Sequence, residues 1–307
     1  RASMTSPTGL QVIGLGESLF DVFDDQTVLG GAPLNVALCA HQCLAKAGGS
    51  GLVASRVGSD SLGRRLIREL ADRGLDTDYV QIDNDRPTGK VLVALADGQP
   101  QYEILKPAAW DAMQFDRRWG ALATKCDAVC FGTLAQRSAV SREAIDRFLL
   151  NTTSALKLFD VNLRQNFYSS SLIENGLERA TALKLNADEI IRVGALLGME
   201  SCDADTACSL LLKKYNLRFV ALTLGAEGLR LYTPGAVNAA EPVHYPTARD
   251  ADAVGAGDAA SAGLMIGFLL GWNVSQTLTV ANHLGAYVAS VPGATPQLPS
   301  VILKMIN

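Results

Sequence analysis

Residues 249–272 read RDADAVGAGDAASAGLMIGFLLGW, a glycine-containing turn followed at once by a long segment of apolar and small residues. The apolar segment predicts a buried helix that begins at the turn. The first turn of a helix carries unpaired N–H groups and the positive end of the helix dipole, and glycine lets a ligand approach that backbone closely. The stretch therefore predicts an anion hole suited to a phosphate group. Its amides belong to Gly255, Ala256 and Gly257.

Two acids, Asp252 and Asp258, flank this turn. Asp258 falls in the first turn of the predicted helix, at the mouth of the anion hole. A carboxylate placed there can accept a proton from a hydroxyl group that attacks phosphorus. The alternative is a plain helix start with tight packing against a neighbouring helix.

The composition is that of an ordinary globular protein. The chain has 307 residues, of which 48% are hydrophobic and 19% charged, and its net charge is -4. This charge argues against nucleic acid or an anionic membrane surface as the main partner. The longest apolar run, residues 259–272, is shorter than the ~20 residues of a membrane-spanning helix. No secretory signal is visible, so we expect a cytoplasmic protein. The six cysteines lack zinc-site spacing, and we expect buried, reduced thiols.

Outward from the glycine turn, short apolar runs alternate with segments of helical spacing. This alternation predicts βαβ units and a mainly parallel sheet, in which ligands bind beyond the carboxyl ends of the strands. The expected strands lie at residues 11–16, where the run ends in a turn, and at 51–54, 128–131, 156–159, 182–185 and 219–224. The expected helices lie at residues 62–73, 141–150, 172–180 and 204–215.

Residues 79–105 break this alternation because they contain strand-like runs and no helical segment. We expect a β excursion that, together with part of residues 17–30, covers a site as a lid. An edge hairpin without a gating role is the alternative. No linker or repeat divides the chain, so we expect a single domain over residues 1–307 with this inserted lid.

A second polar cluster lies near the start of the chain. Asp21 follows the first expected strand, Gly30 and Gly31 form a flexible turn, and Asn35 comes one helical turn later. A carboxylate, exposed amides and a carboxamide at short range suit the hydroxyl groups of a polyol. Other phosphate-binding motifs do not fit, since GxxxxGK[ST] is absent and Leu19 stands where a dinucleotide fingerprint needs glycine.

The two clusters together resemble the PfkB (ribokinase-like) family of carbohydrate kinases. The resemblance rests on GGAPLNVA at 30–37 and DADAVGAGDAASAG at 250–263, with DVNLR at 160–164, LNADE at 185–189 and TLGAEG at 223–228 between them. It implies a three-layer α/β/α fold with a mainly parallel sheet and a small β-sheet lid. It also implies an enzyme that uses ATP and Mg²⁺, in some members with K⁺.

The resemblance assigns roles to single positions. Asp258 is similar to the catalytic base, and the 255–257 amides to the anion hole. The sugar-binding positions are Asp21, Gly30, Gly31 and Asn35. The ATP-site positions are Asn186, Thr223, Gly225, Gly228 and Asn282. Glu189 corresponds to an indirect Mg²⁺ contact and Asp252 to a K⁺ loop.

Arg164 is the candidate for a buried cation near phosphate and for a substrate contact, since its planar fork suits oxyanions. A plain ion pair between Asp160 and Arg164 at a strand end is the alternative. Three other groups also have plain alternatives. The Asn186–Glu189 pair could be a solvated helix start, and the glycines of 223–228 could form only a strand turn. Asn282 could be a residue on a helix surface.

Two positions depart from the family signature, with Ala253 in place of the common Thr and Ala260 in place of Phe. The sequence is most similar to fructokinases, with 2-keto-3-deoxygluconate kinase and ribokinase as alternatives and nucleoside kinases less favoured. A non-catalytic sugar or nucleotide sensor is the alternative of another class.

A homodimer through the lid is expected from the alternation of apolar residues at Val91, Val93 and Leu95.

Overall fold

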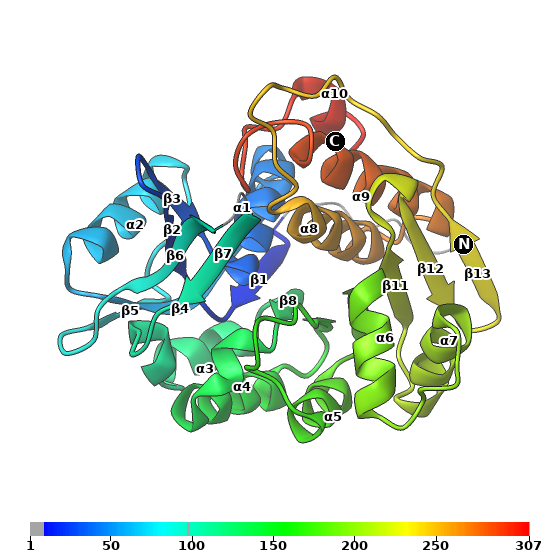
Figure 1. Ribbon diagram of the computed structural model, residues 1–307, viewed down its shortest axis with the longest axis horizontal. Coiled ribbons are helices and arrows are strands. Elements are labelled where there is room, and N and C mark those ends of the chain that lie inside the picture. The colour runs from blue at the N-terminus through cyan, green and yellow to red at the C-terminus, as the bar shows by residue number, and fades with distance from the viewer. Residues whose placement is uncertain (1–8, 97–98, 307) are drawn as a thin grey trace.

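The computed structural model describes residues 9–96 and 99–306, which form a large sheet covered by helices and a small separate sheet (Figure 1). Within these residues the large sheet has nine strands in the order β13-β12-β11-β10-β9-β8-β1-β4-β5. Its strands are β1 (Gln11–Leu15), β4 (Ser50–Gly58), β5 (Val80–Asp83), β8 (Ala128–Phe131), β9 (Leu156–Asp160), β10 (Ala182–Asn186), β11 (Phe219–Thr223), β12 (Leu229–Thr233) and β13 (Ala236–Ala239). All neighbours from β11 to β5 are parallel, and β12 and β13 are antiparallel.

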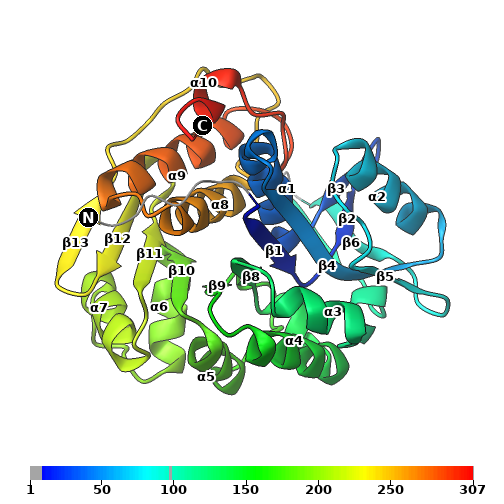
Figure 2. The ribbon, with the colours of Figure 1, turned by 180° about the vertical axis from the view of Figure 1, so that it is seen from behind.

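Helices cover both faces of the large sheet, as Figures 1 and 2 show from opposite sides. One face carries α1 (Ala32–Leu44), α8 (Ala256–Leu269), α9 (Val274–Val288) and α10 (Ser300–Leu303). The other carries α3 (Arg117–Ala123), α4 (Ala139–Asn151), α5 (Ser170–Arg179), α6 (Ala187–Leu196) and α7 (Ala204–Lys214). Each layer buries its own apolar cluster against the sheet, which gives the expected three-layer α/β/α arrangement.

The small sheet is the predicted lid, with the strand order β3-β2-β6-β7. Its strands are β2 (Leu19–Val22), β3 (Thr27–Gly30), β6 (Gly89–Ala96) and β7 (Gln99–Ile104). The expected lid boundary at residue 79 is wrong, because β5 pairs in parallel with β4 and belongs to the large sheet. One lid face is packed against α1 and α2 (Ser61–Asp72), through a cluster that contains Phe20 and Leu29.

Val91 and Val93, two of the alternating apolar residues of the lid, face the body of the protein. Val91 is buried in the main core cluster, and Val93 packs against that cluster. The Leu95 side chain lies outside the described residues. The homodimer through the lid stays a prediction, and Val91 is covered by this chain itself.

The lid joins the body next to Arg137, whose side chain is 4% exposed. Its guanidinium donates to both carboxylate oxygens of Asp111 at 2.8 Å and to the Leu105 carbonyl at 3.0 Å. The same group lies 3.9 Å from the centre of the Trp110 ring. These contacts fix the chain where β7 returns to the body.

Small residues let α8 and α9 approach each other closely. A Cβ atom on Gly263 would lie 2.7 Å from the Cα atom of Ala281. This packing explains why the segment after the glycine turn is rich in alanine and glycine. None of the six cysteines, all of which lie in the described residues, forms a disulfide, and five of them are buried. Within the described residues, no helix combines the length and the apolar character needed to cross a membrane.

Candidate active site

The two polar clusters predicted from the sequence meet at one hydrogen bond. The Asn35 amide donates to Oδ2 of Asp258 at 2.8 Å, across 223 positions of the chain. Asn35 lies in the first turns of α1 and is 4% exposed, and Asp258 lies in the first turn of α8. The expected sugar-binding residue therefore contacts the expected base directly.

The turn before α8 has free N–H groups, as expected of an anion hole. Gly255 caps the helix with a φ of 80°, a left-handed conformation that favours glycine. A Cβ atom at this position would lie 2.4 Å from the Ala294 carbonyl oxygen. Among the described residues the N–H groups of Gly255 and Gly257 donate no hydrogen bond, whereas Ala256 donates to the Ala253 carbonyl at 3.3 Å. The hole therefore has two uncommitted amides, and the third belongs to the turn itself.

Asp21 and the paired glycines lie together at the lid. A Cβ atom on Gly30 would lie 2.7 Å from Oδ2 of Asp21, so the missing side chain makes room for this carboxylate. Gly31 has a φ of 115° and precedes α1, and a Cβ atom there would lie 2.5 Å from the Glu17 carbonyl oxygen. Both glycines are therefore required by close approach to the 17–21 segment.

The acids of this site hold protons more tightly than usual. Burial raises the pKa of Asp258 to about 6, and the charge of Asp160 adds to the effect. Lys184, the Asn35 amide and Arg164 act in the opposite direction on that pKa. Burial also raises the pKa of Asp21 to about 6, against the charge of Arg164. A carboxylate with a pKa near 6 is still ionised at pH 7 and is a better proton acceptor than an ordinary one.

The buried cation of the site is Lys184, not Arg164 as the sequence suggested. Arg164 is exposed and donates to the neighbouring Leu163 carbonyl at 3.2 Å. Lys184 lies in β10 directly beside Asp160 of β9, and its ammonium lies 3.0 and 3.2 Å from the two oxygens of that carboxylate. The alternative interpretation, an ion pair of Asp160 with Arg164, is therefore wrong, because Asp160 pairs with Lys184.

Glu17 is a second residue that the sequence analysis did not identify. It follows β1 and is 2% exposed, and its Oε2 atom has no hydrogen-bond partner among the described residues. Burial raises its pKa to about 7, with smaller contributions in the same direction from Asp258 and Asp160 and an opposing one from Arg164. Glu17 is therefore a further carboxyl group near Asp258, in addition to Asp160.

Asn186 and Glu189 form a reciprocal cap at the start of α6. The Glu189 N–H donates to Asn186 Oδ1 at 2.8 Å, and the Asn186 N–H donates to Glu189 Oε2 at 2.9 Å. The other Glu189 oxygen accepts from the Leu163 N–H at 2.9 Å. Glu189 is 6% exposed, so the pair is not the solvated helix start of the alternative interpretation.

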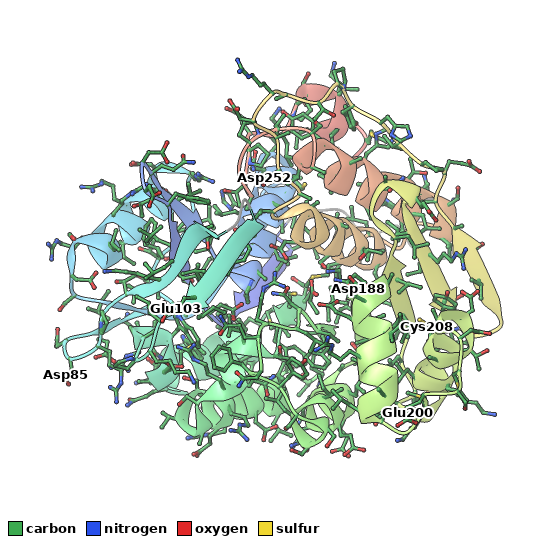
Figure 3. All side chains as sticks on the ribbon, in the orientation of Figure 1. Asp85, Glu103, Asp188, Glu200, Cys208 and Asp252 are labelled. Carbon is green, nitrogen blue, oxygen red and sulfur yellow. The ribbon has the colours of Figure 1, made fainter. Side chains whose placement is uncertain are left out.

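A cavity of about 350 Å³ lies in front of this cap. Its lining consists of Leu163, Arg164, Gln165, Tyr168, Asn186, Asp188, Glu189 and Arg192. Figure 3 shows Asp188 at the start of α6 and Asp252 in the loop before α8. Asp252 is exposed and accepts from the Val254 N–H at 2.9 Å.

The remaining expected ATP-site residues lie at the end of β11, in the turn that follows it, and in the middle of α9. Thr223 ends β11, and Gly225 and Gly228 take left-handed conformations with φ of 60° and 87° in the turn to β12. A Cβ atom on Gly228 would lie 3.3 Å from Oδ1 of Asn282. Asn282 is 7% exposed and donates to the Glu241 carbonyl at 2.6 Å, so it is not the surface residue of the alternative interpretation.

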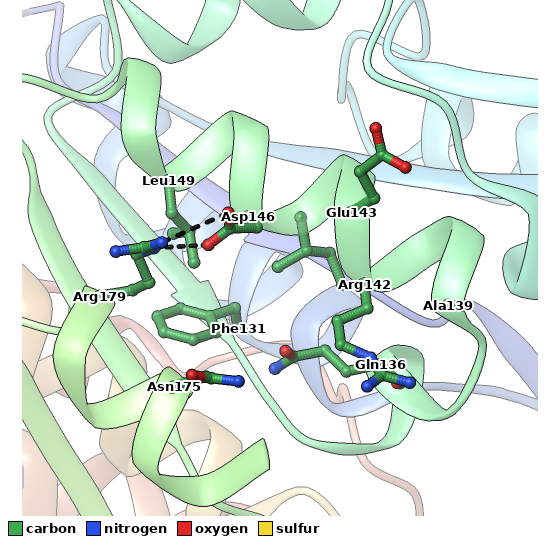
Figure 4. A pocket seen from close by; sticks show the side chains of 11 residues that line it. Phe131, Gln136, Ala139, Arg142, Glu143, Asp146, Leu149, Asn175 and Arg179 are labelled. Atoms are coloured by element: carbon green, nitrogen blue, oxygen red, sulfur yellow. Dashed lines mark hydrogen bonds and ion pairs between the residues drawn. The ribbon is translucent and has the colours of Figure 1, made fainter. Parts of the chain in front are cut away.

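Another cavity, of about 330 Å³, lies between α4 and α5 (Figure 4). It is lined by an Asp146–Arg179 ion pair, together with Gln136 and Asn175. It contains none of the residues expected from the sequence, and we assign it no role.

Comparison with known proteins agrees with this geometry. The sequence matches the pfkB family carbohydrate kinase over residues 10–301. The chain belongs to the pfkB family of carbohydrate kinases. It is therefore a phosphotransferase with an alcohol group as acceptor, and the predicted family and enzyme class are confirmed.

The following relatives of this carbohydrate kinase are at most 30% identical to it in sequence. A putative sugar kinase from Pyrococcus horikoshii is 30% identical over 78% of this chain and 73% of its own length. The fructokinase of Escherichia coli is 27% identical over 93% of this chain and 95% of its own length. Among solved structures, a Xylella fastidiosa fructokinase with bound ATP superposes with a TM-score of 0.84 at 22% identity, covering 98% of both chains. This superposition confirms the predicted ribokinase-like fold.

Both departures from the family signature have a local explanation in this kinase. The Ala253 side chain is exposed, and the residue supports the turn through its backbone carbonyl. Ala260 is 4% exposed and lies at the interface with α9, where its Cβ atom would lie 3.5 Å from a Cβ atom on Gly285. Neither position disturbs Asp258 or its bond to Asn35.

Proposed function

We propose that this kinase transfers the γ-phosphoryl group of ATP to a primary hydroxyl group of a hexose, with fructose as the first candidate. The hydrogen bond between Asn35 and Asp258 is the observation that supports it most, because it joins a polyol-binding cluster to a base beside an anion hole. The Escherichia coli fructokinase and the ATP-bound Xylella fastidiosa structure support the choice of sugar and nucleotide.

The proposed reaction begins with proton transfer to Asp258. The sugar hydroxyl gives its proton to this carboxylate while its oxygen attacks the γ-phosphorus in line, and the bond to ADP breaks. Asn35 holds the carboxylate in place through its 2.8 Å bond. The free N–H groups of Gly255 and Gly257 are placed to stabilise charge that develops on the transferred group.

The lid supplies the sugar contacts and excludes water in this proposal. Asp21 accepts hydrogen bonds from sugar hydroxyls, and Gly30 and Gly31 let the 17–21 segment pack closely enough to place this carboxylate. The lid strands close over the same end of the sheet, which limits hydrolysis of ATP. Thr223, Gly225, Gly228 and Asn282 form the nucleotide side of the site.

The chemistry of the cavity beside α6 fits Mg²⁺ bound through water. Asn186 and Glu189 present oxygen atoms, and each Glu189 oxygen already accepts one backbone N–H group, which leaves room for a water-mediated contact. Mg²⁺ would neutralise phosphate charge there. A K⁺ site near Asp252 remains a prediction.

One observation favours 2-keto-3-deoxygluconate as a second candidate. Arg164 lines the cavity, and its charge opposes the burial that raises the pKa of Asp21, so a guanidinium acts electrostatically on the proposed sugar site. A guanidinium pairs well with the carboxylate of a sugar acid.

The test is coupled ADP release at saturating Mg-ATP over fructose, 2-keto-3-deoxygluconate, ribose, glucose and adenosine. The proposal predicts turnover of one hexose substrate, with fructose highest. An Arg164→Met variant separates the two candidates, because it should weaken use of the sugar acid far more than use of fructose. Binding of a sugar without turnover of any would contradict the proposal and favour the sensor.

A further inference from the structure

A buried ion pair lies below the anion hole. The side chains of Lys184 and Asp160 are 8% and 3% exposed, and the ammonium contacts both carboxylate oxygens. Ser261 donates to Asp160 Oδ2 at 2.9 Å, so this carboxylate has partners on two sides. We call Lys184 and Asp160 the buried pair.

The buried pair is clamped to the helix that carries the base. A Cβ atom on Gly257 would lie 2.8 Å from Nζ of Lys184, so the ammonium packs against the residue directly before Asp258. Ser261 lies three positions after Asp258, on the same side of α8. The pair therefore touches this helix both before and after the catalytic carboxylate.

Stability alone gives no reason to place charges here. Two buried ions must lose their hydration, and apolar residues of similar size often give an equally stable protein. Leu158 and Leu183, buried neighbours in the same strands, show that these strands accept apolar residues. The position of the charges next to the anion hole therefore points to a role in the reaction.

We infer that Lys184 and Asp160 are positioning residues for phosphoryl transfer, which hold the first turn of α8 and place a fixed positive charge behind the anion-binding amides. The inference rests on the proposed function, since it takes Asp258 as the base. It adds two residues that act through Asp258 and the turn. Neither residue is required to touch the substrate.

The charges that face Asp258 come from several elements. Lys184 and Asp160 lie on β10 and β9, Glu17 follows β1, and Arg164 lies in the loop after β9. On Asp258, the charge of Asp160 raises the pKa, and the charges of Lys184 and Arg164 lower it.

Two further carboxyl groups complete this electrostatic environment. The charge of Asp258 contributes to the raised pKa of Glu17. Burial lowers the pKa of the Lys184 ammonium, but the charges of Asp160, Glu189 on α6 and Asp258 outweigh it and raise that pKa.

Lys184 and Asp160 have opposite effects on the pKa of Asp258, so replacing each of them should move this pKa in a different direction. Lys184→Met removes a positive charge, so Asp258 should titrate at higher pH. Asp160→Asn removes a negative charge, so Asp258 should titrate at lower pH. The double variant removes both charges and should return the titration close to that of the unmodified protein. A structural role would give no such opposition.

The test is a carbon-13 NMR titration of protein labelled at the aspartate carboxyl carbons, between pH 4 and 9. Asp258→Asn identifies the resonance, and Ser261→Ala serves as a milder variant that keeps both charges. We expect the Asp258 midpoint to move by about one pH unit, up for Lys184→Met and down for Asp160→Asn. The acidic limb of kcat/KM should follow, with roughly tenfold lower activity of Lys184→Met at pH 6, relative to its own plateau.

Midpoints that move in the same direction, or that do not move in folded variants, would overturn the inference. If Lys184→Met does not fold because Asp160 is left unpaired, Asp160→Asn and the double variant decide, since the former must lower the midpoint and the latter must restore it. The NMR result does not depend on turnover. An Asp258→Asn protein that retains turnover would instead contradict the proposed function, so the two failures are distinguishable.

Discussion

Replacement of Asn35 by Ala tests how the site prepares its base. Asn35 is 4% exposed, and its amide donates to Asp258 at 2.8 Å. This bond favours the ionised carboxylate and so opposes the burial that raises the pKa of Asp258 to about 6. Without the donor, the carboxylate should hold its proton to higher pH. The reaction needs the ionised form, so activity should be lost at a higher pH than in the unmodified enzyme.

The size of the shift follows from the hydrogen bond. A bond to a charged group contributes ~1.5–3 kcal/mol, and ~1.4 kcal/mol corresponds to one pKa unit. A loss of about 2 kcal/mol would therefore move the Asp258 midpoint by about 1.5 pH units, to roughly 7.5. At pH 6.5 the variant would then hold roughly eightfold less ionised Asp258 than the unmodified enzyme.

The measurement is kcat/KM between pH 5 and 9 by coupled ADP release, with each variant normalised to its own alkaline plateau. Normalisation separates the titration from any weaker sugar binding. Asn282→Ala is the matched control, since it removes another buried asparagine that bonds to a backbone carbonyl far along the chain. Its acidic limb should stay at the position of the unmodified enzyme. An unshifted limb in Asn35→Ala would refute the reasoning.

Three further predictions concern stability and the turn. Glu17 has a folded pKa of about 7 against an ordinary value of 4.5, so the folded state binds more protons than the unfolded state. The free energy of unfolding should therefore fall by about 3 kcal/mol as the pH rises from 4.5 through 7. Glu17→Gln should remove this loss, and thermal unfolding at pH 5 and pH 8 measures it. Arg137→Met should cost about 3 kcal/mol or more by leaving Asp111 without its partner, whereas Arg137→Lys should cost less in the same denaturant titration. Gly255→Ala should reduce kcat roughly 100-fold or more, because a Cβ atom 2.4 Å from the Ala294 carbonyl displaces the turn; an alanine variant with unchanged kcat would remove the turn from the mechanism.

Six strands of the large sheet, from β11 to β4, and several of its helices could be predicted because their signals are local. Buried parallel strands are continuous apolar runs, and the helices between them show helical spacing. The lid boundary could not be placed in this way. A short run such as β5 (Val80–Asp83) looks the same whether it pairs with β4 or with the lid, and only the pairing decides.

The placement of Gly255 and Asp258 at the start of a helix was predictable, because it depends on the local sequence alone. The buried pair was missed because it depends on register, with Lys184 directly beside Asp160 in the neighbouring strand. A lysine inside the apolar run ALKL was the available signal, since a charge in a buried strand needs a partner. Glu17 gave no comparable signal, because nothing in its spacing shows that the loop after β1 is buried.

The central claim is that Asp258 is the base of phosphoryl transfer, and Asp258→Asn tests it most directly. The substitution keeps the shape of the side chain and removes the proton acceptor. With ATP and sugar binding confirmed by calorimetry, we predict that kcat falls by roughly 10²–10⁴-fold. Turnover of Asp258→Asn within a few-fold of the unmodified enzyme would contradict the account.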